Sequence, residues 1–361
     1  MRVYTARWLL PVASPPVRDG AVAVDAAGRI AYAGPAAGAP PGALHPLGTT
    51  VLLPGLVAAH LAPAWPAAAG VTTVATPIAG ATDRDALLAS GLRAVAYHTV
   101  VGPTPADREP ALAALRTAVA RTCAAIAAAG ATARVRSGVA LGPIETVHED
   151  LAIDAGAWAV AENLPLAIVA GASAEEVAYL RDAAGPHADA LRAAGLDVVR
   201  RAHSTVHLLA ELGVAAVARP LLAGGAFFDE SDVALAAYYG CPVAYKPFGT
   251  PPTPGPFAAL LDARVPVVLA APDPLAAARH LAPTPADALH LVTLGAARAL
   301  GLDAEIGSLE VGKAADLCAF ALAPAALRVA DASGPDHALI ASPTPPHLTT
   351  VNGVPLRTPA A

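Results

Sequence analysis

Short apolar runs alternate with longer alanine-rich amphipathic stretches over most of the chain from residue 51 onward. The apolar runs predict strands at Val51–Val57, Val71–Thr76, Ala94–Val101, Ala133–Leu141, Leu166–Ala170, Val217–Leu222, Pro242–Tyr245 and Val265–Ala270. The stretches between them predict helices, among them Pro105–Ala129, Glu149–Asn163, Asp229–Tyr239 and Gly255–Ala263. Continuous apolar runs are typical of strands buried on both faces of a parallel sheet. Eight such strands with helices between them predict an α/β fold of the (β/α)8 barrel type.

Both ends of the chain have a β pattern instead. At the N-terminus we expect strands at Arg2–Leu10, Ala21–Asp25 and Ile30–Gly34, the last two joined in a hairpin. After a helix predicted at Ala286–Leu302, we expect strands at Ser308–Val311, Asp316–Ala321 and Leu348–Thr358, with Asn352-Gly353 as a type I′ turn. The sequence therefore predicts a small β-sandwich-like domain of residues 1–50 and 306–361, and a barrel domain of residues 51–305.

The composition is apolar but not that of a membrane protein. Hydrophobic residues make up 55% of the chain and charged residues 14%, and the mean hydropathy is +0.52, which excludes intrinsic disorder. Residues 30–82 lack Asp, Glu, Lys and Arg, but eight prolines interrupt them, so no spanning helix is expected there. The net charge is −6 and lysine occurs only at positions 246 and 313, which argues against nucleic acid and anionic membranes as partners.

Cysteine usage and the N-terminal segment bear on the compartment. Cys123, Cys241 and Cys318 are odd in number and widely spaced, which predicts neither a disulfide framework nor a zinc knuckle. The apolar segment Trp8–Ala13 is too short for the hydrophobic region of a secretory signal. We expect a soluble, cytoplasmic protein.

Several segments carry a resemblance to a known family. Leu53-Pro54-Gly55-Leu56-Val57-Ala58-Ala59-His60 resembles the entry into the barrel of the amidohydrolase superfamily, and Gly70–Val74 resembles its second strand. Ala296–Leu302 followed by Ile306–Leu317, which reads IGSLEVGKAADL, is very similar to the segment that closes that fold. Together with the barrel pattern the resemblance covers nearly the whole chain, and it is strongest to the cytosine-deaminase and chlorohydrolase-like branch.

The resemblance implies metal-assisted hydrolysis, in which zinc or iron at the barrel mouth lowers the pKa of a bound water. The family's ligands are an HxH motif on strand 1, one histidine each on strands 5 and 6, and an aspartate on strand 8. A proton-shuttling glutamate follows the strand-5 histidine in the deaminase branch. Carried over position by position, the first histidine is His60, but the remaining ligand positions fall on Ala62, Val169, Ala223 and Pro272, and Ala170-Gly171-Ala172 offers no glutamate.

Alanine, valine and proline have no lone pair to donate, and one histidine cannot supply the three protein ligands typical of catalytic zinc. A slip of one residue on strand 8 would bring Asp273 into the ligand position in place of Pro272. The sequence therefore predicts a degenerate metal site and no cofactor, with zinc or iron expected only if the site is intact after all. His60 is the one clear match to a family ligand.

The first crossover is unusually short. Only Ala58–Gly70 separates the first two barrel strands, and Pro63 and Pro66 lie inside this segment. Parallel crossovers need a dozen or more residues, usually helical. We therefore predict that the first barrel helix is missing or reduced to a turn.

Two functional hypotheses follow. In the first, the chain is a catalytically silent homologue that binds a small molecule at the barrel mouth, or a partner protein; a homodimer is an open alternative. In the second, it is an active hydrolase or deaminase of a small cyclic amide or amidine. Its relocated site would draw on His60, His98, Glu145, Lys246 and Asp273.

Each of these candidates also has a structural interpretation. Glu145 and its neighbour His148 suit helix capping or the lining of the mouth, and Lys246, at the end of the seventh strand, suits an ion pair with Asp273. His203 and His207 have the i, i+4 spacing of a metal clamp, but a solvated helix face is the expectation for them.

Overall fold

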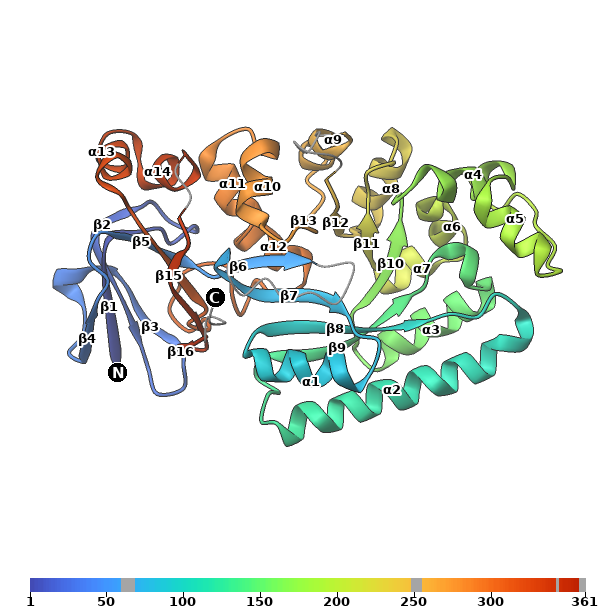
Figure 1. Ribbon diagram of the computed structural model, residues 1–361, viewed down its shortest axis with the longest axis horizontal. Coiled ribbons are helices and arrows are strands. Elements are labelled where there is room, and N and C mark those ends of the chain that lie inside the picture. Colours follow the sequence, from blue (N-terminus) through green and yellow to red (C-terminus); the bar gives the residue numbers. More distant parts are fainter. Residues whose placement is uncertain (60–68, 248–254, 342–343, 357–361) are drawn as a thin grey trace.

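The computed structural model describes residues 1–59, 69–247, 255–341 and 344–356. Within these ranges the chain forms two eight-stranded sheets, one built from both ends of the sequence and one from its middle. The two sheets lie beside each other along the long axis of the molecule, with helices around the second sheet (Figure 1).

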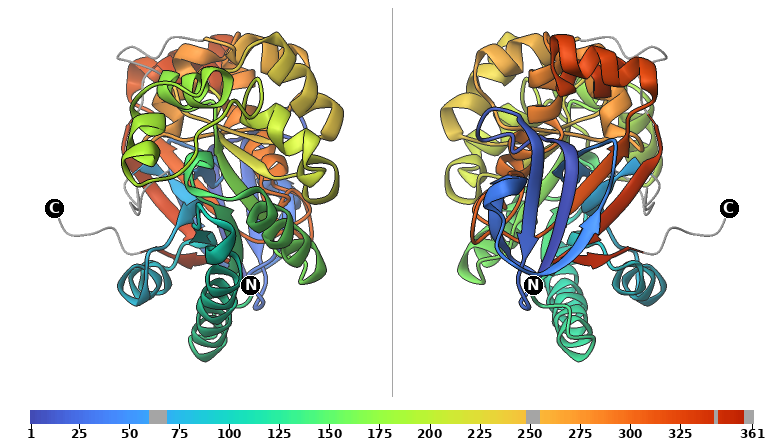
Figure 2. Two further views of the ribbon diagram at one scale, coloured as in Figure 1. Left: turned by 90° about the vertical axis from the view of Figure 1, so that its right-hand side faces the viewer. Right: turned by 90° about the vertical axis from the view of Figure 1, so that its left-hand side faces the viewer.

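The first sheet joins the two ends of the chain. Its N-terminal strands are β1 (Arg2–Leu9), β2 (Val17–Val24), β3 (Ile30–Pro35), β4 (Ala43–Pro46) and β5 (Thr50–Pro54), and its C-terminal strands are β14 (Leu317–Ala321), β15 (Pro346–Val351) and β16 (Val354–Pro355). The order is β16-β15-β14-β5-β1-β2-β3, with β4 paired to β1. The antiparallel pair β5–β14 is the seam between the two ends, and the blue and red strands lie side by side in Figure 2. The β unit predicted from both termini is thus present as one sheet.

The N-terminal and C-terminal hairpins follow from local sequence. Gly28 in the β2–β3 connection has φ 76°, and Asn352 and Gly353 between β15 and β16 have φ of 49° and 68°. Positive φ at both central residues is the requirement of a type I′ turn, which Asn-Gly meets at low cost. By contrast, the strand expected at 308–311 is absent: Ser308 lies in a bend and Val311 in a turn, and the Leu309 amide donates to the Pro11 carbonyl instead of to a neighbouring strand.

The second sheet is the barrel. Its strands are β6 (Leu56–Ala59), β7 (Val71–Pro77), β8 (Arg93–Val100), β9 (Val135–Leu141), β10 (Leu166–Ala170), β11 (Leu221–Gly224), β12 (Val243–Tyr245) and β13 (Val267–Leu269). Every neighbouring pair is parallel, and the strands follow one another in chain order. β13 lies against β6, so the barrel is nearly closed. This confirms the (β/α)8 prediction.

Helices follow the barrel strands as the sequence pattern indicates. They are α1 (Ala81–Ser90), α2 (Arg108–Ala128), α3 (Glu149–Ala161), α4 (Ala174–Asp182), α5 (Pro186–Ala193), α6 (Thr205–Glu211), α7 (Val214–Ala218), α8 (Glu230–Tyr239), α9 (Phe257–Asp262), α10 (Pro274–Leu281), α11 (Pro285–Leu291) and α12 (Leu294–Ala299). Two more, α13 (Pro324–Ser333) and α14 (Pro335–Ala341), lie between β14 and β15. The short 3-10 helices η1 (Ala36–Gly38), η3 (Pro105–Asp107) and η4 (Ile144–Thr146) complete the described elements. The first crossover, residues 60–68, lies outside the described residues, so the prediction of a missing first helix stays a prediction.

Three predicted boundaries are wrong, for local reasons. The strand expected at 51–57 is two strands, because the chain passes from the first sheet to the barrel at Gly55. A Cβ there would lie 2.1 Å from the Thr72 hydroxyl oxygen, so only glycine fits this crossing. The strand expected from Val217 begins at Leu221, because α7 takes up the apolar residues before it. The helix expected at 286–302 breaks at Thr293, whose ψ is −99°.

One described helix, Pro105–Ala128, is long and apolar enough to cross a bilayer by length and composition alone. Its buried side chains, Leu112, Leu115, Val119 and Ile126, belong to the main apolar core, and α2 packs against β8 and β9. That one-sided burial is the packing of a helix on the face of a sheet.

Candidate functional site

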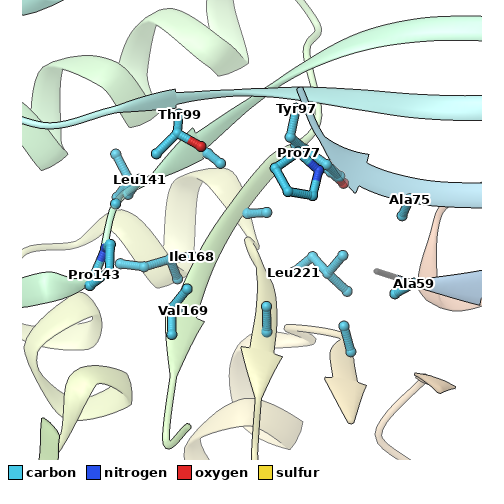
Figure 3. Close-up of a pocket in the computed structure, with 15 residues that line it drawn as sticks. Ala59, Ala75, Pro77, Tyr97, Thr99, Leu141, Pro143, Ile168, Val169 and Leu221 are labelled. Carbon is cyan, nitrogen blue, oxygen red and sulfur yellow. The ribbon is translucent and has the colours of Figure 1, made fainter. Parts of the chain in front are cut away.

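The carboxyl ends of the barrel strands surround a cavity of about 260 Å³ (Figure 3). Residues from seven strands, β6 to β12, line it. Pairs such as Tyr97 and Thr99 on β8 or Leu221 and Ala223 on β11 are two residues apart, which places both members on the inner face of their strand. Active sites of (β/α)8 enzymes lie at this end of the barrel, so this cavity is the candidate site.

The described lining is almost wholly hydrocarbon. Among these residues, only Tyr97 and Thr99 bring polar side-chain atoms, and neither hydroxyl has a hydrogen-bond partner within the described ranges. The Tyr97 ring fits inside the barrel because Gly138 on β9 leaves space, since a Cβ there would lie 2.8 Å from the ring. Burial raises the pKa of the Tyr97 hydroxyl, so it is neutral and acts as one hydrogen-bond donor and acceptor.

Two of the ligand positions inferred from the resemblance face this cavity. Val169, at the strand-5 histidine position, and Ala223, at the strand-6 position, both line it. Asp273 does not: it is exposed and caps α10, where its Oδ1 accepts a hydrogen bond of 2.9 Å from the Ala276 amide. His60 and Ala62 lie outside the described residues.

The remaining candidates are dispersed rather than gathered. His98 is on the opposite face of β8 from Tyr97 and Thr99, in a separate pocket against α2. Glu145 lies 3.3 Å from Nδ1 of His187, and His148 caps α3 by accepting from the Asp150 amide. Their pocket is walled by Tyr179 and Arg201.

Lys246 does not pair with Asp273 as suggested. It is exposed at the end of β12, in a pocket that it shares with Glu175 and Phe227, and no Lys246–Asp273 ion pair occurs in the described part of the chain. The four described candidates His98, Glu145, Lys246 and Asp273 are therefore not brought to one point.

His203 and His207 are not a freely solvated face. His203 Nε2 lies 2.5 Å from a carboxylate oxygen of Asp229, and His207 Nδ1 lies 3.3 Å from Asp232. Burial alone would raise the pKa of Asp229. Hydrogen bonds from Ser231 and His203 outweigh burial and lower this pKa well below its usual range. Asp229 and Asp232 begin α8, so both pairs tie the start of α6 to the start of α8. The acids at the opening of α8 were visible in the sequence, but their pairing with the histidines was not.

A glutamate does lie after β10, but it is turned away from the cavity. Glu176 on α4 accepts hydrogen bonds from the amides of Gly171 and Ala172 and from the Thr205 hydroxyl. Burial raises the pKa of its carboxyl. It is buried and holds the loop after β10 in place; its sequence context gave no signal of this.

The described residues of the cavity do not fit a catalytic zinc ion. Such an ion takes three protein ligands from histidine nitrogen, cysteine sulfur or carboxylate oxygen. The described lining contains none of these side chains, and no group of three or more His, Cys, Asp or Glu in the described ranges is arranged to hold a metal. Neutral tyrosine and threonine hydroxyls are not members of that donor set.

Comparisons with known proteins agree with this architecture. Residues 267–356 match the amidohydrolase family. The fold is similar to that of Helicobacter pylori aminofutalosine deaminase in complex with methylthio-coformycin, with a TM-score of 0.82 at 14% identity over 99% of this chain and 100% of that one. It is also similar to an adenosine deaminase of Xanthomonas campestris with bound zinc, with a TM-score of 0.69 at 20% identity over 98% and 92% of the chains.

A mutant of an atrazine chlorohydrolase from Arthrobacter aurescens, complexed with zinc and atraton, has a TM-score of 0.72 at 14% identity over 98% of this chain and 95% of that one. No curated protein matches the chain with significance. The sequence match to the amidohydrolase family thus covers residues 267–356, and the fold of the whole chain is similar to that of solved deaminases and chlorohydrolases. The resemblance noted in the sequence is confirmed at this level.

Proposed function

We propose that this protein is a non-catalytic member of the amidohydrolase superfamily, which binds a small, neutral, largely apolar molecule in the barrel cavity. The observation that carries the proposal is the lining. Where the resemblance requires metal ligands on strands 5 and 6, the cavity presents the hydrocarbon side chains of Val169 and Ala223.

The proposal rests on the chemistry of water activation. A metal ion lowers the pKa of its bound water only while it is held, and holding it requires lone pairs from several side chains. His60 supplies at most one ligand, and Asp273, which caps α10, is not part of the cavity wall. Replacing a ligand cluster by apolar groups also removes the desolvation cost of buried ionisable side chains, so the fold is stable without it.

The size and polarity of the cavity define the ligand. An engineered apolar cavity of about 150 Å³ binds benzene, so the 260 Å³ available here suits a molecule of one or two rings. No described lining side chain carries a charge, so an ionised ligand would lose its hydration without compensation. The hydroxyls of Tyr97 and Thr99 offer a single polar anchor on β8.

We place this function in the cytoplasm. All three cysteines are free thiols, and Cys241 and Cys318 are buried. Unpaired thiols suit a reducing compartment, where disulfides are rare.

Two measurements on the purified full-length protein test the proposal. In the first, zinc-supplemented protein is incubated with adenosine or guanine, and ammonia release is recorded beside an active zinc deaminase. We expect no release above the blank. Zinc-dependent release would refute the non-catalytic assignment.

In the second, calorimetry follows the binding of indole, a neutral two-ring molecule. We expect Ala223→Phe, which fills the cavity, to abolish binding, and Ala124→Phe, on the exposed side of α2, to leave it unchanged. Indole binding that survives Ala223→Phe would contradict the assigned site.

The alternative of a relocated active site has no comparable support. His98, Glu145 and Lys246 line three separate pockets, and Asp273 lines neither these pockets nor the barrel cavity. General acid–base catalysis needs groups within hydrogen-bond reach of one substrate.

A further inference from the structure

The barrel cavity contains a polar group that the fold itself does not use. Tyr97 on β8 is 5% exposed and lines the cavity (Figure 3). Its hydroxyl forms no hydrogen bond with any described residue. Buried polar groups usually have a partner, because losing water without a replacement bond costs free energy. The Tyr97 hydroxyl is therefore available to a molecule in the cavity.

A bound molecule can reach this hydroxyl. Some polar atoms of the described residues, such as Nε2 of His98 and Oγ1 of Thr73, have neither a hydrogen-bond partner nor surface open to solvent. The Tyr97 oxygen is not one of these sealed atoms, although it also has no partner. Since Tyr97 lines the cavity, the open surface of its oxygen is in contact with whatever fills that space.

The ring that carries the hydroxyl is held in place. Tyr97 belongs to the apolar cluster inside the barrel, together with Val95, and Gly138 on β9 leaves the space that the ring occupies. A donor that is already fixed costs a ligand little ordering entropy. Alanines from other strands leave room for the body of a ligand, since their side chains are short: Ala59, Ala75, Ala140, Ala167, Ala223 and Ala244.

The second hydroxyl of the lining is less suited to selecting a ligand. Thr99 lies two residues further along β8 and is exposed. Water competes for an exposed hydroxyl, so a ligand gains little from a bond to it. A hydrogen bond to the enclosed Tyr97 hydroxyl forms in a lower dielectric, where it is stronger.

The state of the phenol defines the complementary group. Burial raises the pKa of the Tyr97 hydroxyl, so it keeps its proton and can donate it. A phenol donates a hydrogen bond more readily than it accepts one, because the ring draws electron density from the oxygen. Its best partner is an acceptor, and the acceptor must be uncharged because no described lining side chain would compensate a charge. A carbonyl oxygen, with two lone pairs, meets both requirements.

We propose that Tyr97 determines the specificity of the barrel cavity by selecting ring compounds that carry a carbonyl oxygen. The Tyr97 hydroxyl donates to that oxygen, and the hydrocarbon body of the ligand lies against the alanines of the wall. This inference rests on the proposed function in one respect, that the cavity binds a small neutral molecule.

The test compares 1-indanone with indane, which has the same ring system without the carbonyl, by isothermal titration calorimetry on the full-length protein. We expect wild type to bind 1-indanone more tightly than indane by about three- to tenfold, as for one hydrogen bond between neutral groups. Tyr97→Phe should remove this preference and leave the dissociation constant of indane within about twofold.

Two control variants locate the hydrogen bond. Tyr4→Phe removes the hydroxyl of an equally buried tyrosine on β1 of the first sheet, and Thr99→Val removes the other hydroxyl of the lining. Both should keep the preference for 1-indanone. Tyr97→Phe should also be at least as stable as wild type in urea, because it removes a hydroxyl without a partner.

The outcomes separate this inference from the proposed function. Equal binding of indane and 1-indanone to wild type, or the same preference in wild type and Tyr97→Phe, would overturn the inference and leave the cavity assignment intact. Loss of the preference in Thr99→Val but not in Tyr97→Phe would overturn it as well. If neither compound binds, the cavity assignment and the inference fail together. Zinc-dependent ammonia release would refute only the non-catalytic assignment.

Discussion

Replacing Asp316 by alanine should cost this protein several kcal/mol, because it breaks the buried ion pair that fastens the first sheet to the barrel. Arg93 begins β8, and Asp316 immediately precedes β14 in the segment IGSLEVGKAADL. The Arg93 guanidinium donates to Asp316 through bonds of 2.7 and 3.2 Å. The two side chains are 3% and 2% exposed, so water cannot replace a lost partner.

The magnitude follows from what the substitution leaves behind. In Asp316→Ala, the charged Arg93 keeps its bonds to the Ala133 carbonyl and Asn352. It also keeps the long, 3.5 Å bond to the half-exposed carboxylate of Glu305, but it loses both bonds to the buried carboxylate of Asp316. The Asn352 amide also loses its acceptor. Breaking a buried pair on one side costs about 3–5 kcal/mol, whereas replacing both partners by apolar residues is often nearly neutral.

The assay is equilibrium unfolding in urea, followed by circular dichroism. Asp316→Ala should lower the free energy of unfolding by about 3–5 kcal/mol, and the double variant Arg93→Met with Asp316→Leu should lose much less. The matched control is Asp189→Ala, which removes an exposed pair with Arg192 at 3.2 Å and should cost less than about 1 kcal/mol. An Asp316→Ala loss no larger than that of Asp189→Ala would refute the reasoning.

Two further predictions come from local geometry and charge. Gly55→Ala should lower the free energy of unfolding by about 1–3 kcal/mol, because the new methyl group would lie 2.1 Å from the Thr72 hydroxyl oxygen. The control in the same urea assay is Gly80→Ala, where a Cβ meets nothing within 4 Å. Equal losses of stability in the two variants would contradict the prediction. The folded-state pKa of Asp229 is below its unfolded value of about 3.9, so the stability that Asp229 contributes is present above that pH and is lost as pH falls through the folded-state pKa. Asp229→Asn should therefore show a shallower loss of thermal stability than wild type below about pH 4, and parallel melting-temperature profiles would count against the His203–Asp229 pair.

Local patterns predicted most of the barrel. Leu166–Ala170 is a strand with the bounds expected, because a short continuous apolar run is typical of a strand buried on both faces of a parallel sheet. The expected strand at Val217 failed because the apolar residues of α7 look the same as a buried strand. Gly213, with φ 75°, begins the helix, and no period distinguishes five residues of helix from five of strand.

Side-chain partners were harder to predict than elements. Alternation along β8 was enough to place His98 outside the barrel once Tyr97 was placed inside, since consecutive strand residues face opposite ways. The pairing of His203 with Asp229, or of Glu176 with Thr205, joins residues of different elements, and sequence spacing contains no information about such contacts. The capping role of Asp273 could have been predicted from the sequence, because an aspartate directly before a proline, here Pro274, is a common start of a helix.

The most direct test of the central claim is the number of zinc ions that one chain retains. Purified protein is dialysed against excess zinc, passed through a desalting column, and analysed by plasma mass spectrometry beside the His60→Ala variant. The proposal predicts no stoichiometric zinc in wild type and no difference between the two proteins. One equivalent of zinc in wild type that disappears in His60→Ala would contradict it, because the barrel mouth would then hold a metal centre.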